Sequence, residues 1–266
     1  MQAERGTHQQ ALIAVLAGLI GLAWIALWVW ASSPYQTYLG HRALTLDPGG
    51  AILPESVVDQ LRLALALLFV TSWTVMTMAM MLPTSLPLVL LFHRIVARRR
   101  DGSQLVALVI AGYLTVWISF GGLAYLLDRT IHDLVDHQGF LRGATWVLIV
   151  GPLALAGLYQ FTPLKTMCLR RCRSPLGFVT SHWHGSHARY EALRLGLDHG
   201  LFCVGCCWSL MLVMFAAGME QLGIMLGLAV LMAVEKNVSW GRRLTAPLGV
   251  GLLVLAGGLA LRFAGS

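Results

Sequence analysis

Residues 61–92 have the sequence LRLALALLFVTSWTVMTMAMMLPTSLPLVLLF, which is apolar over nearly its whole length. A helix needs about 20 apolar residues to cross the hydrocarbon core of a bilayer, so this stretch is longer than one span requires. It also contains Pro83 and Pro87, and proline removes a backbone donor and kinks or breaks a helix. The stretch therefore predicts a membrane-spanning helix that is kinked or interrupted near its prolines.

The composition of the chain favours a membrane protein. Of the 266 residues, 57% are hydrophobic and 12% are charged, and the mean hydropathy is +0.72. Soluble domains contain about 25% charged residues. The formal net charge of +7 is then interpreted as a signal of topology, and no nucleic-acid partner is expected.

Similar apolar runs recur along the chain. Together they predict seven helical spans, at about residues 11–31, 61–92, 104–127, 144–162, 196–217, 222–237 and 245–264. The first run is interpreted as a retained helix, because no small-residue cleavage site follows it. We expect an all-α polytopic membrane protein. Residues 1–60 would form an N-terminal spanning helix and an extracytoplasmic loop, and residues 61–266 a six-helix metal-binding core.

Basic residues alternate between the predicted loops. They concentrate at residues 94–100, 165–194 and 236–243, whereas the opposite loops are acidic or neutral, as at Asp128 and Asp133. The positive-inside rule then predicts a cytoplasmic N-terminus and an extracytoplasmic C-terminus.

Short motifs suggest an internal repeat. The pattern W-x-x-M occurs at residues 73–76 and 208–211, and L-A-G occurs at residues 155–157 and 255–257. Three predicted spans separate the members of each pair, so the two copies would have opposite orientations, as in inverted-repeat transporters. Because short apolar matches also arise by chance, an inverted three-helix repeat is a hypothesis.

The stretch HGLFCVGCCWSLM, residues 199–211, contains three of the five cysteines. A helix turns by about 100° per residue, which places His199, Cys203, Cys207 and Met211 on one face with Cys206 beside them. Thiolate, thioether and imidazole are ligands for soft and borderline metals, Cu(I) first and Zn(II) next. Further thioethers are available from Met76 and Met80, one turn apart in the stretch 61–92. Packing is the alternative, since methionine and buried cysteine also fill protein cores.

A second cysteine pair lies in TPLKTMCLRRCRSP, residues 162–175. Cys168 and Cys172 are four residues apart and would share one helix face. The surrounding Lys165, Arg170, Arg171 and Arg173 would favour thiolates, unless they only anchor a cytoplasmic loop. Four or five cysteines could then meet at one side of the membrane.

Two further groups contain candidate ligands. The stretch SHWHGSH, residues 181–187, contains His182, and its His184 and His187 have a usable ligand spacing if the segment is helical. Glu235 and Lys236 end the sixth predicted span. We expect Lys236 to extend to the membrane surface, and we treat Glu235 as a candidate ligand because ionisable groups in spans are often functional.

The sequence resembles an uncharacterised bacterial family described as predicted metal-binding integral membrane proteins. The resemblance rests on WTVMTMAMMLPT, YQFTPLKTMCLRRCRSP, HGLFCVGCCWSLM and the Glu235–Lys236 pair, and it covers about residues 61–260. It implies metal binding without a settled reaction, and a location in the bacterial inner membrane. It supports a role for His182 better than for His184 and His187.

These features predict a membrane protein that binds a soft transition metal for handling or delivery, with copper favoured and zinc as the alternative. The candidate ligands are His199, Cys203, Cys206, Cys207, Met211, Met76, Met80, Cys168, Cys172, His182 and Glu235. The expected partners are the lipid bilayer and a membrane enzyme or a metallochaperone. An enzymatic role is not favoured, and no catalytic residue is assigned.

Two alternatives remain at the level of sequence. One is a membrane thiol–disulfide oxidoreductase, in which Cys168 and Cys172 pass electrons to Cys206 and Cys207. The other is an accessory subunit whose sulfur-containing residues only pack.

Overall fold

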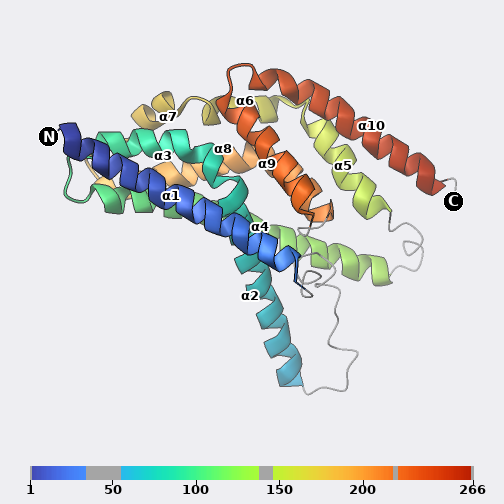
Figure 1. The fold of residues 1–266 in the computed structure, drawn as a ribbon. Helices are drawn as coiled ribbons and strands as arrows, with labels where there is room; N and C mark the ends of the chain where they lie inside the picture. The colour runs from blue at the N-terminus through green and yellow to red at the C-terminus, as the bar shows by residue number, and fades with distance from the viewer. Residues whose placement is uncertain (1, 34–54, 138–145, 218–220, 265–266) are drawn as a thin grey trace.

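The computed structural model describes residues 2–33, 55–137, 146–217 and 221–264, and over these residues it contains helices and no strand (Figure 1). The all-α prediction is therefore confirmed for the described chain. The predicted extracytoplasmic loop lies largely outside it, and α2 begins before the predicted boundary at residue 60. The elements are α1 (Gln2–Ala31), α2 (Glu55–Met80), α3 (Leu82–Val96), α4 (Gly102–His137), α5 (Val147–Tyr159), α6 (Pro163–Cys172), α7 (Pro175–His182), α8 (Ala188–Ala217), α9 (Leu222–Asn237), the 3₁₀ turn η5 (Gly241–Leu244) and α10 (Thr245–Ala264).

The stretch 61–92 forms two helices, which confirms the predicted interruption. α2 ends at Met80 and α3 begins at Leu82, with a proline in the first turn of α3, where its missing N–H would have no helical partner. The carbonyl of Met81 accepts hydrogen bonds from the hydroxyls of Thr84 at 2.7 Å and Tyr113 at 3.2 Å. The break therefore places Met81 at a buried corner between α2 and α3.

Five segments of the described chain are long and apolar enough to cross a membrane. They are residues 9–31, 56–80, 102–127, 188–214 and 241–263. The seven predicted spans are not confirmed, because α5 has 13 residues and α9 has 16. Both are shorter than the about 20 residues that a spanning helix needs. The inverted repeat is not confirmed either.

Glycines bring the backbones of α4 and α8 close together. A Cβ atom on Gly112 would lie 2.6 Å from the carbonyl oxygen of Leu193, and one on Gly196 would overlap the carbonyl of Val109. Small residues permit this close approach between helices. The contact fixes the position of α8, which carries three of the five cysteines.

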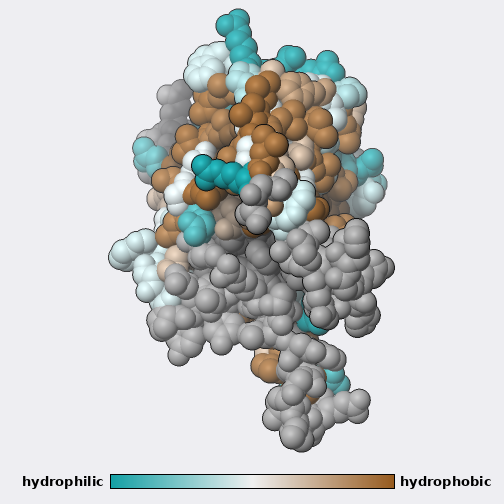
Figure 2. All heavy atoms as spheres, turned by 90° about the vertical axis from the view of Figure 1, so that its right-hand side faces the viewer, coloured by the Kyte–Doolittle hydropathy of each residue, from teal (hydrophilic) through white to brown (hydrophobic). Residues whose placement is uncertain are grey.

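Apolar side chains cover much of the outer surface. Leu22, Leu63, Leu158, Val254 and Leu261 are all more than half exposed. Figure 2 shows the side on which α5 and α10 end, and hydrophobic side chains dominate its described upper part, with hydrophilic ones mostly at the margins. Exposed apolar surface of this extent is typical of a membrane or protein contact.

Candidate metal centre

The two cysteine groups of the sequence meet between α6 and α8. The Sγ atom of Cys206 lies 3.9 Å from the Sγ atom of Cys172. A Cβ atom on Gly205 would lie 2.7 Å from the Sγ atom of Cys168, so α6 packs directly on this turn of α8. All five cysteines are free thiols, and Cys203, Cys206 and Cys207 are almost completely buried. The structure thus gathers every cysteine of the chain in one region.

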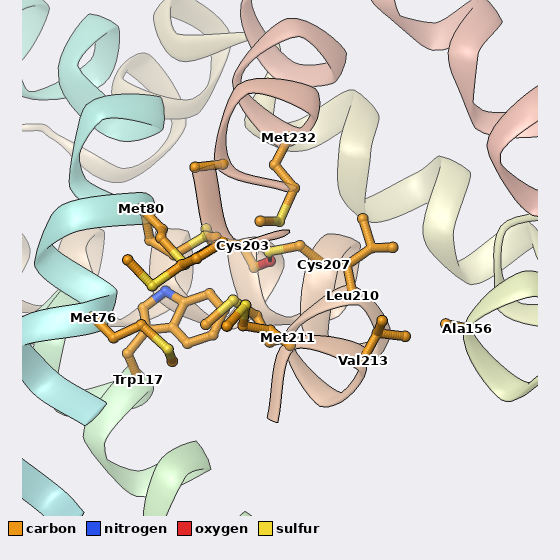
Figure 3. Close-up of a cluster of buried hydrophobic side chains, with 14 of the residues drawn as sticks. Met76, Met80, Trp117, Ala156, Cys203, Cys207, Leu210, Met211, Val213 and Met232 are labelled. Carbon is orange, nitrogen blue, oxygen red and sulfur yellow. Dashed lines mark hydrogen bonds between the residues drawn. The ribbon is translucent and has the colours of Figure 1, made fainter. Parts of the chain in front are cut away.

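The sulfur-rich face of α8 points into the helix bundle. Met211 is fully buried there with Cys203 and Cys207, and Met76 and Met80 of α2 belong to the same buried cluster. Figure 3 shows these methionines and Met232 of α9 around the two cysteines. The face therefore opposes the methionine-rich part of α2, as the helical spacing suggests.

A direct thiol–thioether contact lies within this cluster. The Sγ atom of Cys207 is 3.7 Å from the Sδ atom of Met81. The thiols of Cys206 and Cys207 also donate hydrogen bonds to the carbonyl of Cys203, at 3.1 and 2.8 Å. These bonds tie the two thiols to the backbone of Cys203, one turn earlier in α8. We refer to Cys203, Cys206, Cys207, Cys172 and Met81 as the sulfur cluster.

Lys236 is the site residue that the sequence interpretation missed. Its Nζ atom lies 2.9 Å from the Sγ atom of Cys203, 3.8 Å from that of Cys207 and 3.2 Å from the hydroxyl of Thr84. Lys236 is only 5% exposed, so the prediction that it reaches the membrane surface is wrong. Since α9 packs against α2, α3 and α8, its C-terminal turn is enclosed by protein. An ionisable residue in an apolar segment was the signal that could have identified it.

Tyr113 of α4 makes a second contact to Cys203 that the sequence did not suggest. Its hydroxyl lies 3.1 Å from the Sγ atom of Cys203, and its ring stacks on the ring of His199 with centroids 5.7 Å apart. The Nε2 atom of His199 lies 3.3 Å from the hydroxyl of Ser85, and its Nδ1 atom has no hydrogen-bond partner within the described part of the chain. Tyr113 therefore contacts both His199 and Cys203, and so links His199 to the sulfur cluster.

Glu235 forms a buried ion pair with Lys165. Its Oε2 atom lies 2.8 Å from the Nζ atom of Lys165, and its Oε1 atom accepts a hydrogen bond of 3.2 Å from Thr245. The guanidinium of Arg173 donates to the backbone carbonyl of the same Glu235. This network joins α6, α9 and α10 beside the cysteines, and a role of Glu235 as a metal ligand stays a prediction.

The cationic surroundings of Cys168 and Cys172 do not favour thiolates. Hydrogen bonds with Cys203 and Cys206 raise the pKa of the Cys172 thiol well above its ordinary value, and burial raises the pKa of the Cys168 thiol. These pKa directions do not support the predicted thiolate pair. The nearby cations face other groups, because Lys165 pairs with a carboxylate and Arg173 with backbone carbonyls.

His182 lies in a different environment. Its Nε2 atom is 3.2 Å from Asp198 and its Nδ1 atom is 2.8 Å from the carbonyl of Phe178. The segment after it is a loop, since Gly185 has a φ angle of +80°. The backbone amides of His184 and His187 donate to the carboxylate of Glu191. The helical spacing considered for His184 and His187 is thus wrong.

The donor atoms of the sulfur cluster are thiols and a thioether. Over the described residues, no three side chains of His, Cys, Asp or Glu are arranged to hold a metal ion as they stand. Soft sulfur donors select Cu(I), which accepts low coordination numbers, whereas closed zinc sites use four Cys or His ligands. The thioether of Met81 is a soft donor of the kind that Cu(I) accepts, whereas the four thiols of the cluster are also ligands that zinc accepts.

Fold and site together define a helical protein with apolar outer faces and a buried thiol–thioether cluster. The chain belongs to the PpoB2 family, described as copper chaperones, whose model matches residues 70–259. Every candidate ligand named above lies within the matched residues. No curated protein and no solved structure matches the chain. Membership supports a copper-handling role and agrees with the metal-related family expected from the sequence.

Proposed function

We propose that the protein is an integral membrane copper chaperone, which receives Cu(I) at the sulfur cluster and delivers it to a membrane enzyme. The observation that carries this proposal is the convergence of Cys203, Cys207 and Met81 in a chain of a copper chaperone family. Five helical segments of suitable length and composition support insertion into a membrane.

Cys203 and Cys207 are the proposed ligands, with Met81 as a neutral third donor. Cu(I) bound by two thiolates carries one net negative charge, and burying an unpaired charge is costly. The ammonium of Lys236, 2.9 Å from Cys203, supplies the compensating positive charge. Two thiolates, Cu(I) and the ammonium together would have no net charge, which accounts for a buried lysine at this position.

The orientation of the protein is proposed from its basic residues. We place α6 and the turn between α9 and α10 on the cytoplasmic side of the bacterial inner membrane, because these two segments contain clustered Arg residues. The thiols would then lie towards the cytoplasm, with the buried methionines Met211 and Met214 further along α8.

Copper binding by the purified protein tests the proposal. Detergent-purified protein is titrated with Cu(I) in competition with a chromophoric Cu(I) chelator, and the wild type should retain copper at near-stoichiometric level. The double variant Cys203→Ser/Cys207→Ser should lose most of it, because a hydroxyl replaces each soft donor. Met214→Leu is the matched control and should retain copper. Equal copper retention in the wild type and the double serine variant would refute the assignment.

A thiol oxidoreductase is the second candidate, and the contact of 3.9 Å between Cys172 and Cys206 favours it. Formation of a disulfide there would release two electrons and two protons to an oxidised acceptor such as a quinone. Thiol trapping of the protein in isolated membranes distinguishes the two functions. A chaperone should retain reduced thiols in both resting and respiring membranes, whereas an oxidoreductase should show a Cys172–Cys206 disulfide that depends on respiration.

A further inference from the structure

Copper passes between proteins by ligand exchange, so a sulfur of the donor must meet a sulfur of the acceptor. Among the five cysteines Cys172 alone is partly exposed, and the other four are buried. Cys172 ends α6, and its Sγ atom lies 3.9 Å from that of the buried Cys206. Cys172 is therefore the cysteine of the sulfur cluster that reaches the protein surface.

The surface around Cys172 is strongly basic. Residues 163–175 and 238–244 contain no Asp or Glu, and Lys165 is already neutralised by its buried ion pair. Arg173 joins the two segments, because its guanidinium donates to the carbonyls of Val238 at 2.7 Å and Ser239 at 3.0 Å. Figure 1 shows α6 and the turn between α9 and α10 at the same end of the molecule. The arginine surface consists of the exposed residues Arg170, Arg171, Trp240, Arg242 and Arg243.

An open pocket lies within this surface. It has a volume of about 510 Å³ and is lined by Ser239, Trp240, Arg242 and Arg243. Guanidinium groups bind carboxylates through paired hydrogen bonds, and exposed Trp and Arg residues are typical of the residues that dominate protein interfaces. Trp240 is 52% exposed, so a partner that covered it would bury a large apolar side chain. The chemistry of the pocket suits acidic side chains.

We propose that the arginine surface docks an acidic protein that carries Cu(I), and that Cys172 is the thiol at which copper is exchanged. The inference rests on the proposed copper chaperone function. The positive charge of the surface attracts the acidic partner. Copper bound at Cys172 then moves inward to the neighbouring Cys206. Anionic lipid headgroups would also bind arginines, but lipid binding does not require a partly exposed thiol beside the arginines.

Rates of copper transfer from two synthetic peptides test this docking surface. Both peptides hold Cu(I) in the same Cys-x-x-Cys motif, one flanked by glutamates and the other by lysines, and the acceptor is the full chain in phosphatidylcholine nanodiscs. At low ionic strength the acidic peptide should transfer copper about tenfold faster, and added salt should remove the difference. Arg242→Glu/Arg243→Glu leaves the surface with two arginines and two glutamates and should abolish the preference, and Cys172→Ser should slow transfer from both peptides. Arg262→Glu, an exposed arginine on α10, is the control and should change nothing.

The outcomes separate this inference from the proposed function. Copper content after equilibration with acetonitrile-stabilised Cu(I) reports the proposed function alone and should be unchanged in the arginine double variant. Equal transfer rates from the two peptides, in a wild type that holds copper, would overturn only the docking surface. A second result would also overturn the docking surface: the arginine double variant loses binding to phosphatidylglycerol vesicles but keeps the wild-type transfer rates. The arginines would then bind anionic lipid and not a protein partner.

Discussion

The Nζ atom of Lys236 lies 2.9 Å from the Sγ atom of Cys203, and both residues are buried. The two residues come from α9 and α8, which are joined by a short connection after Ala217. A buried cation beside a potential metal ligand indicates a site built for an anionic complex. This relationship supports the proposed copper site more directly than any single cysteine does.

Replacing Lys236 should weaken copper binding. Lys236→Met keeps the length of the side chain but removes the charge that balances two thiolates and Cu(I). Loss of a group that supports metal ligands lowers metal affinity by about 10–100-fold, and we expect this loss in competition titrations with a Cu(I) chelator. Lys236→Arg keeps the charge and should recover part of the affinity. Wild-type affinity in Lys236→Met would show that the lysine has no part in copper binding.

The ion pair between Lys165 and Glu235 should stabilise the fold without binding copper. Glu235→Gln leaves the ammonium of Lys165 buried without its counter-charge, and removing one partner of such a pair costs about 3–5 kcal/mol. The midpoint of thermal unfolding in detergent should fall clearly, while copper per folded molecule stays at the wild-type level. Selective loss of copper with an unchanged midpoint would instead identify Glu235 as a ligand.

The contact between α4 and α8 should not tolerate a methyl group. Gly196→Ala would press a Cβ atom onto the carbonyl of Val109, and overpacking of this kind costs about 1–3 kcal/mol. We expect a lower midpoint of thermal unfolding and a lower yield of folded protein. Gly227→Ala is the matched control in α9, where no atom lies within 4 Å of the added methyl. A similar midpoint for both variants would contradict the close packing.

The proposed orientation predicts which residues are labelled from each side of the membrane. Cysteines are introduced singly at Arg98 and Thr130 in a Cys172→Ser background, because the other four native cysteines are buried. An impermeant maleimide should reach position 98 only in inverted vesicles and position 130 only in right-side-out vesicles. The reverse labelling pattern would show that the protein has the opposite orientation in the membrane.

Part of the fold followed from the sequence because its causes are local. The prolines at 83 and 87 predicted the break after α2, and helical spacing predicted one face for Cys203, Cys207 and Met211. The seven predicted spans stay a prediction, because apolar composition alone does not fix how long each helix is. α5 and α9 are as apolar as longer helices but end after 13 and 16 residues.

The charged part of the site was harder to predict because it depends on contacts between distant residues. Glu235 and Lys165 are 70 positions apart, and Lys236 and Cys203 are 33 positions apart. A lysine at the end of an apolar helix is compatible with extension to the membrane surface or with an inward turn. Only the packing of α9 against α8 decides between them, and no pattern within α9 encodes it.

X-ray absorption at the copper edge of the Cu(I)-loaded, purified protein tests the central claim most directly. The sulfur cluster predicts Cu(I) with sulfur as its nearest neighbours, and loss of this signal in Cys203→Ser/Cys207→Ser. Nitrogen or oxygen neighbours in the wild type would contradict the account, since they would place the metal at His182, His199 or Glu235 instead of the sulfur cluster.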